Sequence, residues 1–387
     1  MIKKLLYFAI IICVACGVVS CEPKQDEPPF VPDKDAKHTA LVYMMADNNL
    51  GYSYHFDATN IEAMCEAFID NDINGRLMIF LSQRRSDPYL LEILSNDKHQ
   101  CYIDTLKVYE GCLSTDTATL GMVMRDVREI SKTPSYGLFV WTHATGWLPQ
   151  YRFYKGKRRE APASIGLEGR EQLTMDIDFF AEALKPYRHE YIIFDACMMS
   201  CVEVAYELRD VCDHIIATPT ETMGAGFPYY DIVPLIFADT IDYEEVCRKY
   251  SDEYINNVGN EGTIALIETR YMEELAEVCE RIVRGRDADI AAIDSRLLQY
   301  YDRINPHVFY DLVHYMQQLA DEEQCAELEQ VLDKAVPYKE ASHKFLGITI
   351  DHYSGVSSYI PGVAQDAVVE EYYRTLQWYK RVYENIE

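Results

Sequence analysis

Residues 191–208 read Tyr-Ile-Ile-Phe-Asp-Ala-Cys-Met-Met-Ser-Cys-Val-Glu-Val-Ala-Tyr-Glu-Leu, and this stretch decides the fold. The apolar run ends at Asp195 and Cys197, and the pattern then changes to helical spacing. The stretch therefore predicts a strand, a sharp exit and a helix. Ligands and chemistry collect outside the carboxyl ends of strands in an α/β sheet, so we expect Cys197 to face a cleft.

A second stretch of the same kind precedes it. Residues 136–147 form an apolar run that predicts a strand ending at His143. A thiol and an imidazole at two strand ends can act as nucleophile and base. The alternative is structural, because a cysteine taken alone is usually a small buried hydrophobe.

These stretches resemble a known signature. Residues 141–147, Trp-Thr-His-Ala-Thr-Gly-Trp, and residues 194–199, Phe-Asp-Ala-Cys-Met-Met, are similar to the paired signature of the clostripain family of cysteine peptidases, in the caspase-like clan. The resemblance continues in the same order over nearly the whole mature chain, through residues 42–50, 219–229 and 356–361. It implies that Cys197 attacks the peptide bond and that His143 transfers the protons.

The resemblance also implies an oxyanion hole made by the backbone N–H groups of Ala144 and Cys197. One position departs from the family, which usually has glycine directly after the catalytic histidine. Ala144 keeps the N–H, but its Cβ makes a glycine-only backbone angle costly. The sequence assigns no third member of a triad, and the resemblance implies a Cys/His dyad.

Asp195 predicts which substrate side chain the cleft prefers. Residues i and i+2 of a strand point to the same side, so Asp195 and Cys197 are expected to face one cleft. A buried carboxylate is costly unless a cation meets it, which favours substrates with Arg or Lys at the cleaved bond. The resemblance implies the same preference, since this aspartate matches the one that confers it in the family. The alternative is that Asp195 caps the following helix.

The loop at residues 219–230 is predicted to line the substrate groove. Gly224 and Gly226 allow close backbone approach there. Glu221 and Thr222 are candidate substrate contacts, and a plain turn is the alternative.

A basic loop at residues 152–159 stands out in an acidic chain. Exposed loops are preferred sites of nicking, and precursors in the clostripain family are often activated by cleavage in this loop. We therefore predict self-cleavage near Lys155, Lys157, Arg158 and Arg159. The alternative is a solvated loop that pairs with acidic neighbours.

The N-terminal segment predicts export. Two lysines precede an apolar run at residues 5–19 that is too short to span a bilayer, which fits a signal peptide over residues 1–20. Residues 18–21, Val-Val-Ser-Cys, resemble the lipobox of bacterial lipoproteins and predict acylation of Cys21. The proline-rich residues 21–37 would then be a tether. We expect a lipid-anchored protein of the bacterial cell envelope, in the periplasm or at the cell surface, whose only membrane contact is the anchor. A soluble secreted protein is the alternative.

The composition and net charge of the chain limit the kinds of partner and cofactor to be expected. A hydrophobic content of 49% and a charged content of 26% are ordinary for a globular protein. The net charge of -27 repels nucleic acid and anionic lipid, so no nucleic-acid partner is expected. No metal motif is present and no cofactor is predicted to be obligatory. Only the family resemblance suggests a response to calcium, and the sequence contains no recognisable calcium-binding loop.

The order of elements predicts an α/β fold. Alternating strands and helices over residues 38–268 indicate a core with a largely parallel sheet and helices on both faces, and the family resemblance implies that this core is caspase-like. Residues 269–340 read as a mostly helical subdomain. Residues 341–387 are expected to complete the core with a strand at residues 347–351 and one helix at residues 364–383.

Three functions fit these features. The first is an endopeptidase that cuts after Arg or Lys. The second is a catalytically inactive surface lipoprotein that binds basic peptides in the same cleft, and the third is a structural or glycan-handling surface lipoprotein. A thiol-reactive probe separates the first from the others, because an activated cysteine is labelled far faster than a buried one.

Overall fold

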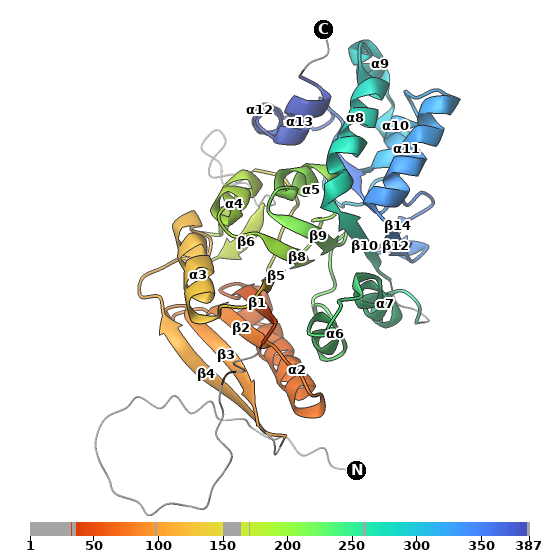
Figure 1. The fold of residues 1–387 in the computed structure, drawn as a ribbon. Coiled ribbons are helices and arrows are strands. Elements are labelled where there is room, and N and C mark those ends of the chain that lie inside the picture. The colour runs from red at the N-terminus through yellow and green to blue at the C-terminus, as the bar shows by residue number, and fades with distance from the viewer. Residues whose placement is uncertain are drawn as a thin grey trace, which may run out of the picture.

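The structure is a computed structural model that describes residue 32 and residues 36–96, 99–149, 164–169, 171–257 and 261–384. A nine-stranded sheet runs through its centre in the order β12-β10-β9-β8-β5-β1-β2-β3-β4 (Figure 1). The strands are β1 (His38–Met45), β2 (Arg76–Ser82), β3 (Tyr89–Ser95), β4 (Cys101–Val108), β5 (Ser135–Trp141), β8 (His189–Asp195), β9 (Cys212–Ala217), β10 (Thr263–Glu268) and β12 (Tyr338–Ala341).

The middle of the sheet is parallel. β2, β1, β5, β8 and β9 pair in parallel, while β3 and β4 at one edge and β10 and β12 at the other pair antiparallel. All eight residues of β1 are buried, as expected for a strand covered on both faces. The predicted α/β class with a largely parallel sheet is confirmed.

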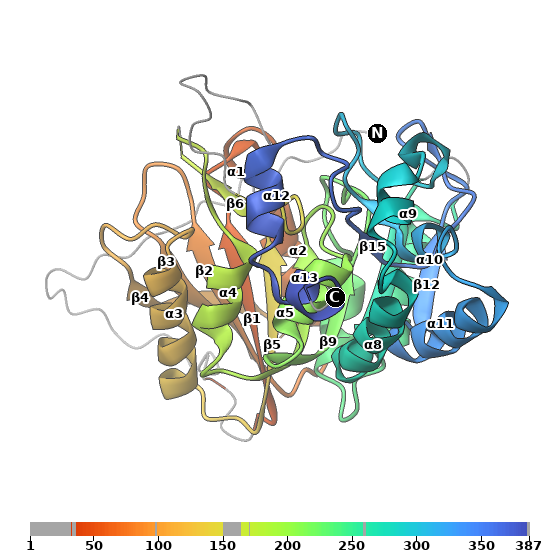
Figure 2. The ribbon, with the colours of Figure 1, turned by 90° about the horizontal axis from the view of Figure 1, so that it is seen from above.

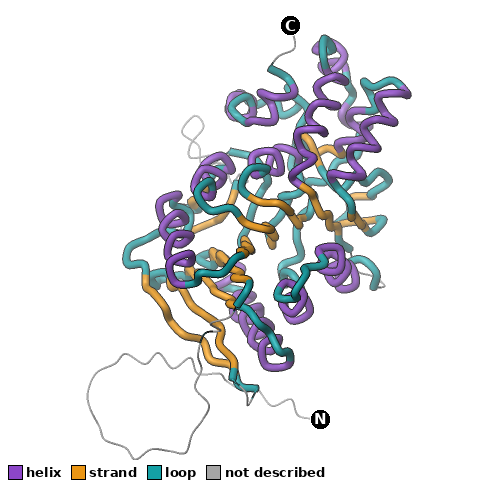
Figure 3. The backbone as a smooth tube through the Cα atoms, viewed as in Figure 1, coloured by secondary structure: helices purple, strands orange, loops and turns teal. Residues whose placement is uncertain are grey.

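Helices cover both faces of the sheet, with the strands between them (Figures 1 and 3). One layer consists of α2 (Phe56–Asp70), α6 (Tyr229–Ile236) and α7 (Tyr243–Tyr254), which share an apolar cluster with Tyr191 and Ile193 of β8. The opposite layer includes α3 (Thr117–Ile130), α4 (Ile177–Leu184), α5 (Val202–Leu208) and α8 (Met272–Val283), as Figure 2 shows. None of the described helices has the length and hydrophobicity required to cross a bilayer.

The segment after β10 is mostly helical. It contains η1 (Thr269–Tyr271), α8, α9 (Asp287–Ala292), η2 (Ser295–Leu297), β11 (Tyr310–Asp311), α10 (Leu312–Met316) and α11 (Glu322–Ala335). Leu275 of α8 and Leu332 of α11 belong to the same apolar cluster as Phe194 of β8. The end of the predicted range 269–340 is a strand, because β12 pairs with β10 at the edge of the main sheet.

The C-terminal elements differ from the prediction. The strand expected at residues 347–351 is instead half of a small hairpin, β13 (Lys344–Phe345) and β14 (Ile348–Thr349), since Leu346 and Gly347 adopt positive φ in a tight turn. The single helix expected at residues 364–383 is two, α12 (Ala367–Tyr373) and α13 (Gln377–Val382). Tyr373 and Trp378 are both fully buried, and residues five apart lie on different faces of one helix, so the chain must turn between them.

Candidate active site

His143 and Cys197 leave the sheet at the same edge. β5 and β8 are parallel neighbours, and their register pairs Trp141 with Asp195. The N–H of Thr142 donates to the carbonyl oxygen of Asp195 at 3.2 Å. His143 and Cys197 each follow this register pair by two residues. Because adjacent strands lie about 4.8 Å apart, His143 and Cys197 belong to neighbouring loops at this edge of the sheet.

The two strand-end loops contact each other. A Cβ on Gly146 would lie 2.7 Å from the carbonyl oxygen of Met198, so only glycine permits this approach. The N–H of Met198 donates to the carbonyl of Thr220 at 2.8 Å, which joins the cysteine loop to the loop after β9. The edge of the sheet is thus enclosed by three loops held together through their backbones.

Asn49 orients the imidazole. It is the first residue of α1 (Asn49–Tyr52), and its Oδ1 lies 2.7 Å from Nε2 of His143. Since Oδ1 only accepts, Nε2 carries the hydrogen and Nδ1 is the nitrogen left to exchange a proton with the thiol. Burial lowers the pKa of His143, so the ring is neutral at neutral pH and can act as a base.

Cys197 is half-buried at the head of the loop. Its Sγ accepts a hydrogen bond from the N–H of Thr222 at 3.3 Å. Burial raises the pKa of the thiol to about 12, and the negative charges of Glu221 and Asp195 add to this. The thiol is therefore protonated at rest, and a neutral histidine must remove its proton for attack.

The backbone at Ala144 suits an oxyanion hole. Ala144 forms an isolated antiparallel bridge with Ile165 of β6 (Ile165–Glu168), in which the flanking Thr145 N–H and His143 carbonyl make the hydrogen bonds. The N–H of Ala144 thus points away from β6. Neither this N–H nor that of Cys197 donates a hydrogen bond within the described residues. Ala144 does not adopt positive φ, so the predicted cost of its Cβ does not arise.

Asp195 lies almost fully buried, 6% exposed, below the cysteine loop. Its Oδ2 accepts hydrogen bonds from the N–H of Phe227 at 3.1 Å and the hydroxyl of Tyr229 at 3.0 Å, whereas Oδ1 accepts none within the described residues. Burial raises the pKa of this carboxyl to about 7, and the two hydrogen bonds oppose the increase. Asp195 does not cap α5, whose N-cap is Cys201.

The loop after β9 touches both Asp195 and Cys197. A Cβ on Gly226 would lie 2.5 Å from Oδ2 of Asp195, so the loop backbone rests directly on the carboxylate. Thr222 donates from its hydroxyl to the carbonyl of Ala196 at 3.0 Å. Glu221 pairs with Arg303 through two contacts of 2.6 and 3.3 Å. The carboxylate of Glu221 therefore has an ion-pair partner within the protein.

Comparison with known proteins agrees with this geometry. A sequence model of the clostripain family matches residues 42–386. The chain belongs to the clostripain family. It is therefore a cysteine peptidase, a hydrolase whose substrates are peptides or proteins. No functionally curated protein matches it.

Solved structures of family members share the fold. An inactive zymogen of a C11 protease from Parabacteroides distasonis is 30% identical and covers 92% of this chain and 100% of its own, with a TM-score of 0.78. A secreted C11 cysteine protease from Bacteroides thetaiotaomicron, in complex with an irreversible peptide inhibitor, is 25% identical and covers 90% of this chain and 99% of its own, with a TM-score of 0.77. The α/β fold is thus the caspase-like fold of clostripain-family peptidases.

The remaining predicted residues lie outside the described part of the chain. These are Cys21 and the basic-loop residues Lys155, Lys157, Arg158 and Arg159. Within the described part, no three His, Cys, Asp or Glu side chains are grouped to hold a metal ion.

The charge of Glu221 should suppress the reactivity of Cys197. Glu221→Gln removes one of the negative charges that raise the pKa of the thiol, while Arg303 remains and lowers it. We expect iodoacetamide to alkylate Cys197 about two- to tenfold faster at pH 8, since one pKa unit is tenfold in thiolate. Mass spectrometry of the Cys197 peptide measures the rate. Glu274→Gln, at an exposed ion pair with Lys334, is the control, and an unchanged or slower rate in Glu221→Gln contradicts the electrostatic account.

Proposed function

We propose that the protein is an endopeptidase that cleaves after Arg or Lys through Cys197 and His143. The observation that carries this proposal is the buried carboxylate of Asp195, two residues before the nucleophile, with an oxygen that accepts no hydrogen bond within the described residues. Burying a carboxylate without a cation is costly, and the guanidinium or ammonium group of a substrate supplies that cation.

The geometry supports acyl transfer. His143 accepts the thiol proton as Cys197 attacks the carbonyl carbon, and the N–H groups of Ala144 and Cys197 stabilise the oxyanion. His143 then donates that proton to the leaving amine, and afterwards activates the water that releases the acyl group. Asn49 keeps the ring in the required tautomer through Nε2. Its role is to position His143, so the reacting side chains are still a dyad.

Fluorogenic peptides ending in Arg, Lys, Ala or Asp test the proposal. The protein lacking residues 1–21 is assayed with and without calcium, and before and after nicking of the basic loop by trypsin that is then inactivated with an irreversible inhibitor. We expect hydrolysis after Arg and Lys to be at least about a hundredfold faster than after Ala or Asp. The competing function, an inactive lipoprotein that binds basic peptides, is favoured by the protonated resting state of Cys197. It predicts binding of the same peptides with no hydrolysis under any of these conditions.

The specificity should depend on pH. The pKa of about 7 means that Asp195 is largely protonated below pH 6 and ionised above pH 8. Agmatine, a small guanidinium ligand, should therefore bind Cys197→Ala about thirtyfold more tightly at pH 8 than at pH 5.5. Calorimetry measures the Kd. Asp195→Asn should bind agmatine weakly at both pH values, and an equal pH dependence in that variant would assign the effect to another group.

We also propose that the protein cuts its own basic loop. Replacing the five basic residues at positions 152–159 by Gln should leave the chain whole and its peptidase activity at least tenfold lower. Gel electrophoresis reports cleavage, and Cys197→Ala separates self-cleavage from cleavage by another enzyme. Full activity of the uncut variant would rule out a required activation step.

We further propose that Cys21 carries a lipid anchor in the cell envelope. We also propose, from the family resemblance alone, that calcium affects activity without being obligatory. Cys21→Ala should move the protein from the membrane fraction to the soluble fraction. Retention of this variant in the membrane fraction would reject the anchor.

A further inference from the structure

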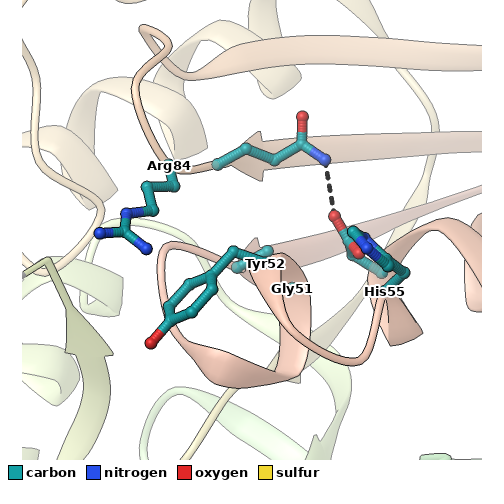
Figure 4. A pocket seen from close by; sticks show the side chains of 7 residues that line it. Gly51, Tyr52, His55 and Arg84 are labelled. Carbon is teal, nitrogen blue, oxygen red and sulfur yellow. Dashed lines mark hydrogen bonds between the residues drawn. The ribbon is translucent and has the colours of Figure 1, made fainter.

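A cavity of about 220 Å³ opens at the same edge of the sheet, between the ends of β1 and β2 (Figure 4). Its walls include Gly51 and Tyr52 of α1, Asp57 in the first turn of α2, and Gln83 and Arg84 after β2. Sites for small organic ligands usually measure 300–1,000 Å³. This cavity is therefore of a size for one side chain of a peptide.

Asp57 forms part of the wall of the cavity. The side chain is only 2% exposed, and its Oδ2 accepts a hydrogen bond from Nε2 of Gln83 at 2.6 Å. Its other oxygen, Oδ1, is buried behind the wall and has no hydrogen-bond partner. Asp57 therefore acts on a ligand in the cavity through the electrostatic potential of its carboxyl group.

Arg84 gives the same cavity a set of donors. Its guanidinium lies over the ring of Tyr52, with 4.4 Å between Cζ and the ring centroid. Figure 4 shows Arg84 and Tyr52 together, on the side of the cavity away from His55. An ammonium or guanidinium ligand would meet the like charge of Arg84, and a carboxylate would meet that of Asp57. A carboxamide, which both donates and accepts, complements both groups.

The position of the cavity relative to Cys197 and His143 indicates which part of a substrate binds in it. The sheet order β8-β5-β1-β2 places His143 between Cys197 and the cavity. Helix α1 connects them, since Asn49 contacts His143 while Gly51 and Tyr52 line the cavity. His143 protonates the leaving amine, so the cavity lies on the leaving-group side. One to two strand spacings, roughly 5–10 Å, correspond to the second or third residue of an extended chain.

We propose that this cavity is a subsite for the carboxamide side chain of Gln or Asn at the second or third position after the cleaved bond. The proposal rests on the peptidase function above. It adds a specificity element on the side of the substrate opposite Asp195.

Internally quenched peptides test the subsite. They share one sequence up to the cleaved Arg and carry Gln, Ala, Lys or Glu at the second or third position after it. We expect kcat/KM for Gln to exceed that for Ala by about five- to twentyfold at one position. The ratio should fall to within twofold of unity in Arg84→Gln and in Asp57→Asn, and should persist in the neighbouring control Arg85→Gln.

Two further measurements distinguish failure of the proposed subsite from failure of the proposed peptidase function. A peptide whose Arg is joined directly to a dye has no residues on the leaving-group side, so its hydrolysis reports the proposed function alone. If that substrate is cut and no preference for Gln appears, the subsite is overturned. If it is not cut, fluorescence anisotropy of the intact peptides with Cys197→Ala still measures the preference, and equal affinity for Gln and Ala peptides overturns it.

Discussion

Replacing Cys197 by alanine is expected to lower kcat/KM on arginine peptides by at least about 10⁴-fold. The thiol is the attacking group, and loss of a nucleophile that acts as a unit with its base removes nearly all covalent catalysis. The initial rate of a fluorogenic peptide ending in Arg measures the loss. Near-ultraviolet circular dichroism should be unchanged, because alanine fills most of the space of a half-buried cysteine.

The matched control is Cys325→Ser, at a partly buried free thiol of α11. It should retain full activity. A loss below tenfold in Cys197→Ala would mean that another group performs the attack, and the assignment of the strand-end thiol would be wrong.

Replacing Asp195 by asparagine should give the second-largest effect. Asparagine has the same shape and keeps an oxygen to accept from the N–H of Phe227 and the hydroxyl of Tyr229, but the negative charge is lost. Leaving a buried cation without its partner costs about 3–5 kcal/mol. We therefore expect kcat/KM on Arg and Lys peptides to fall by about 10²- to 10³-fold, while the slow hydrolysis of Ala peptides changes little.

Tyr229→Phe is the control for this pocket, because it removes one hydrogen bond and keeps the carboxylate. Its effect should stay below about tenfold, and it should raise the pKa of Asp195 further, since the hydroxyl opposes the increase. An equal loss on Arg and Ala peptides in Asp195→Asn would show that Asp195 supports the loop after β9 and does not select the substrate.

The fold and the strand ends could be predicted from periodicity. The apolar runs before His143 and Cys197 end where β5 and β8 end, and the two strands are neighbours as an α/β order suggests. Strand alternation placed Asp195 and Cys197 on one side of the sheet. That rule applies only within the strand, and β8 stops at Asp195. Asp195 contacts the layer of α6, whereas Cys197 packs against the opposite core, and both approach the loop after β9.

The contacts that sequence reasoning missed join residues that are far apart in the sequence. Asn49 stands next to His143 because β1 is the neighbour of β5, yet an amide after a strand signals no chemistry by itself. Its one signal was its place in the family-like residues 42–50. Arg303 reaches Glu221 from the loop between η2 and β11, so nothing near Glu221 in the sequence indicates that it has an ion-pair partner. The chain breaks between α12 and α13 because side chains on both sides of the break are buried in the core. The local spacing of apolar residues does not specify which of these side chains the core buries.

Covalent labelling tests the central claim most directly, because it reads the nucleophile and the specificity together. The protein is incubated with two irreversible peptidyl ketone reagents of identical sequence, one ending in Arg and the other in Asp, and peptide mass spectrometry locates the adduct. The account predicts one adduct, on Cys197, formed by the Arg reagent at least about a hundredfold faster and nearly abolished by Asp195→Asn. Adducts on another residue, or equal rates with the Arg and Asp reagents, would contradict it.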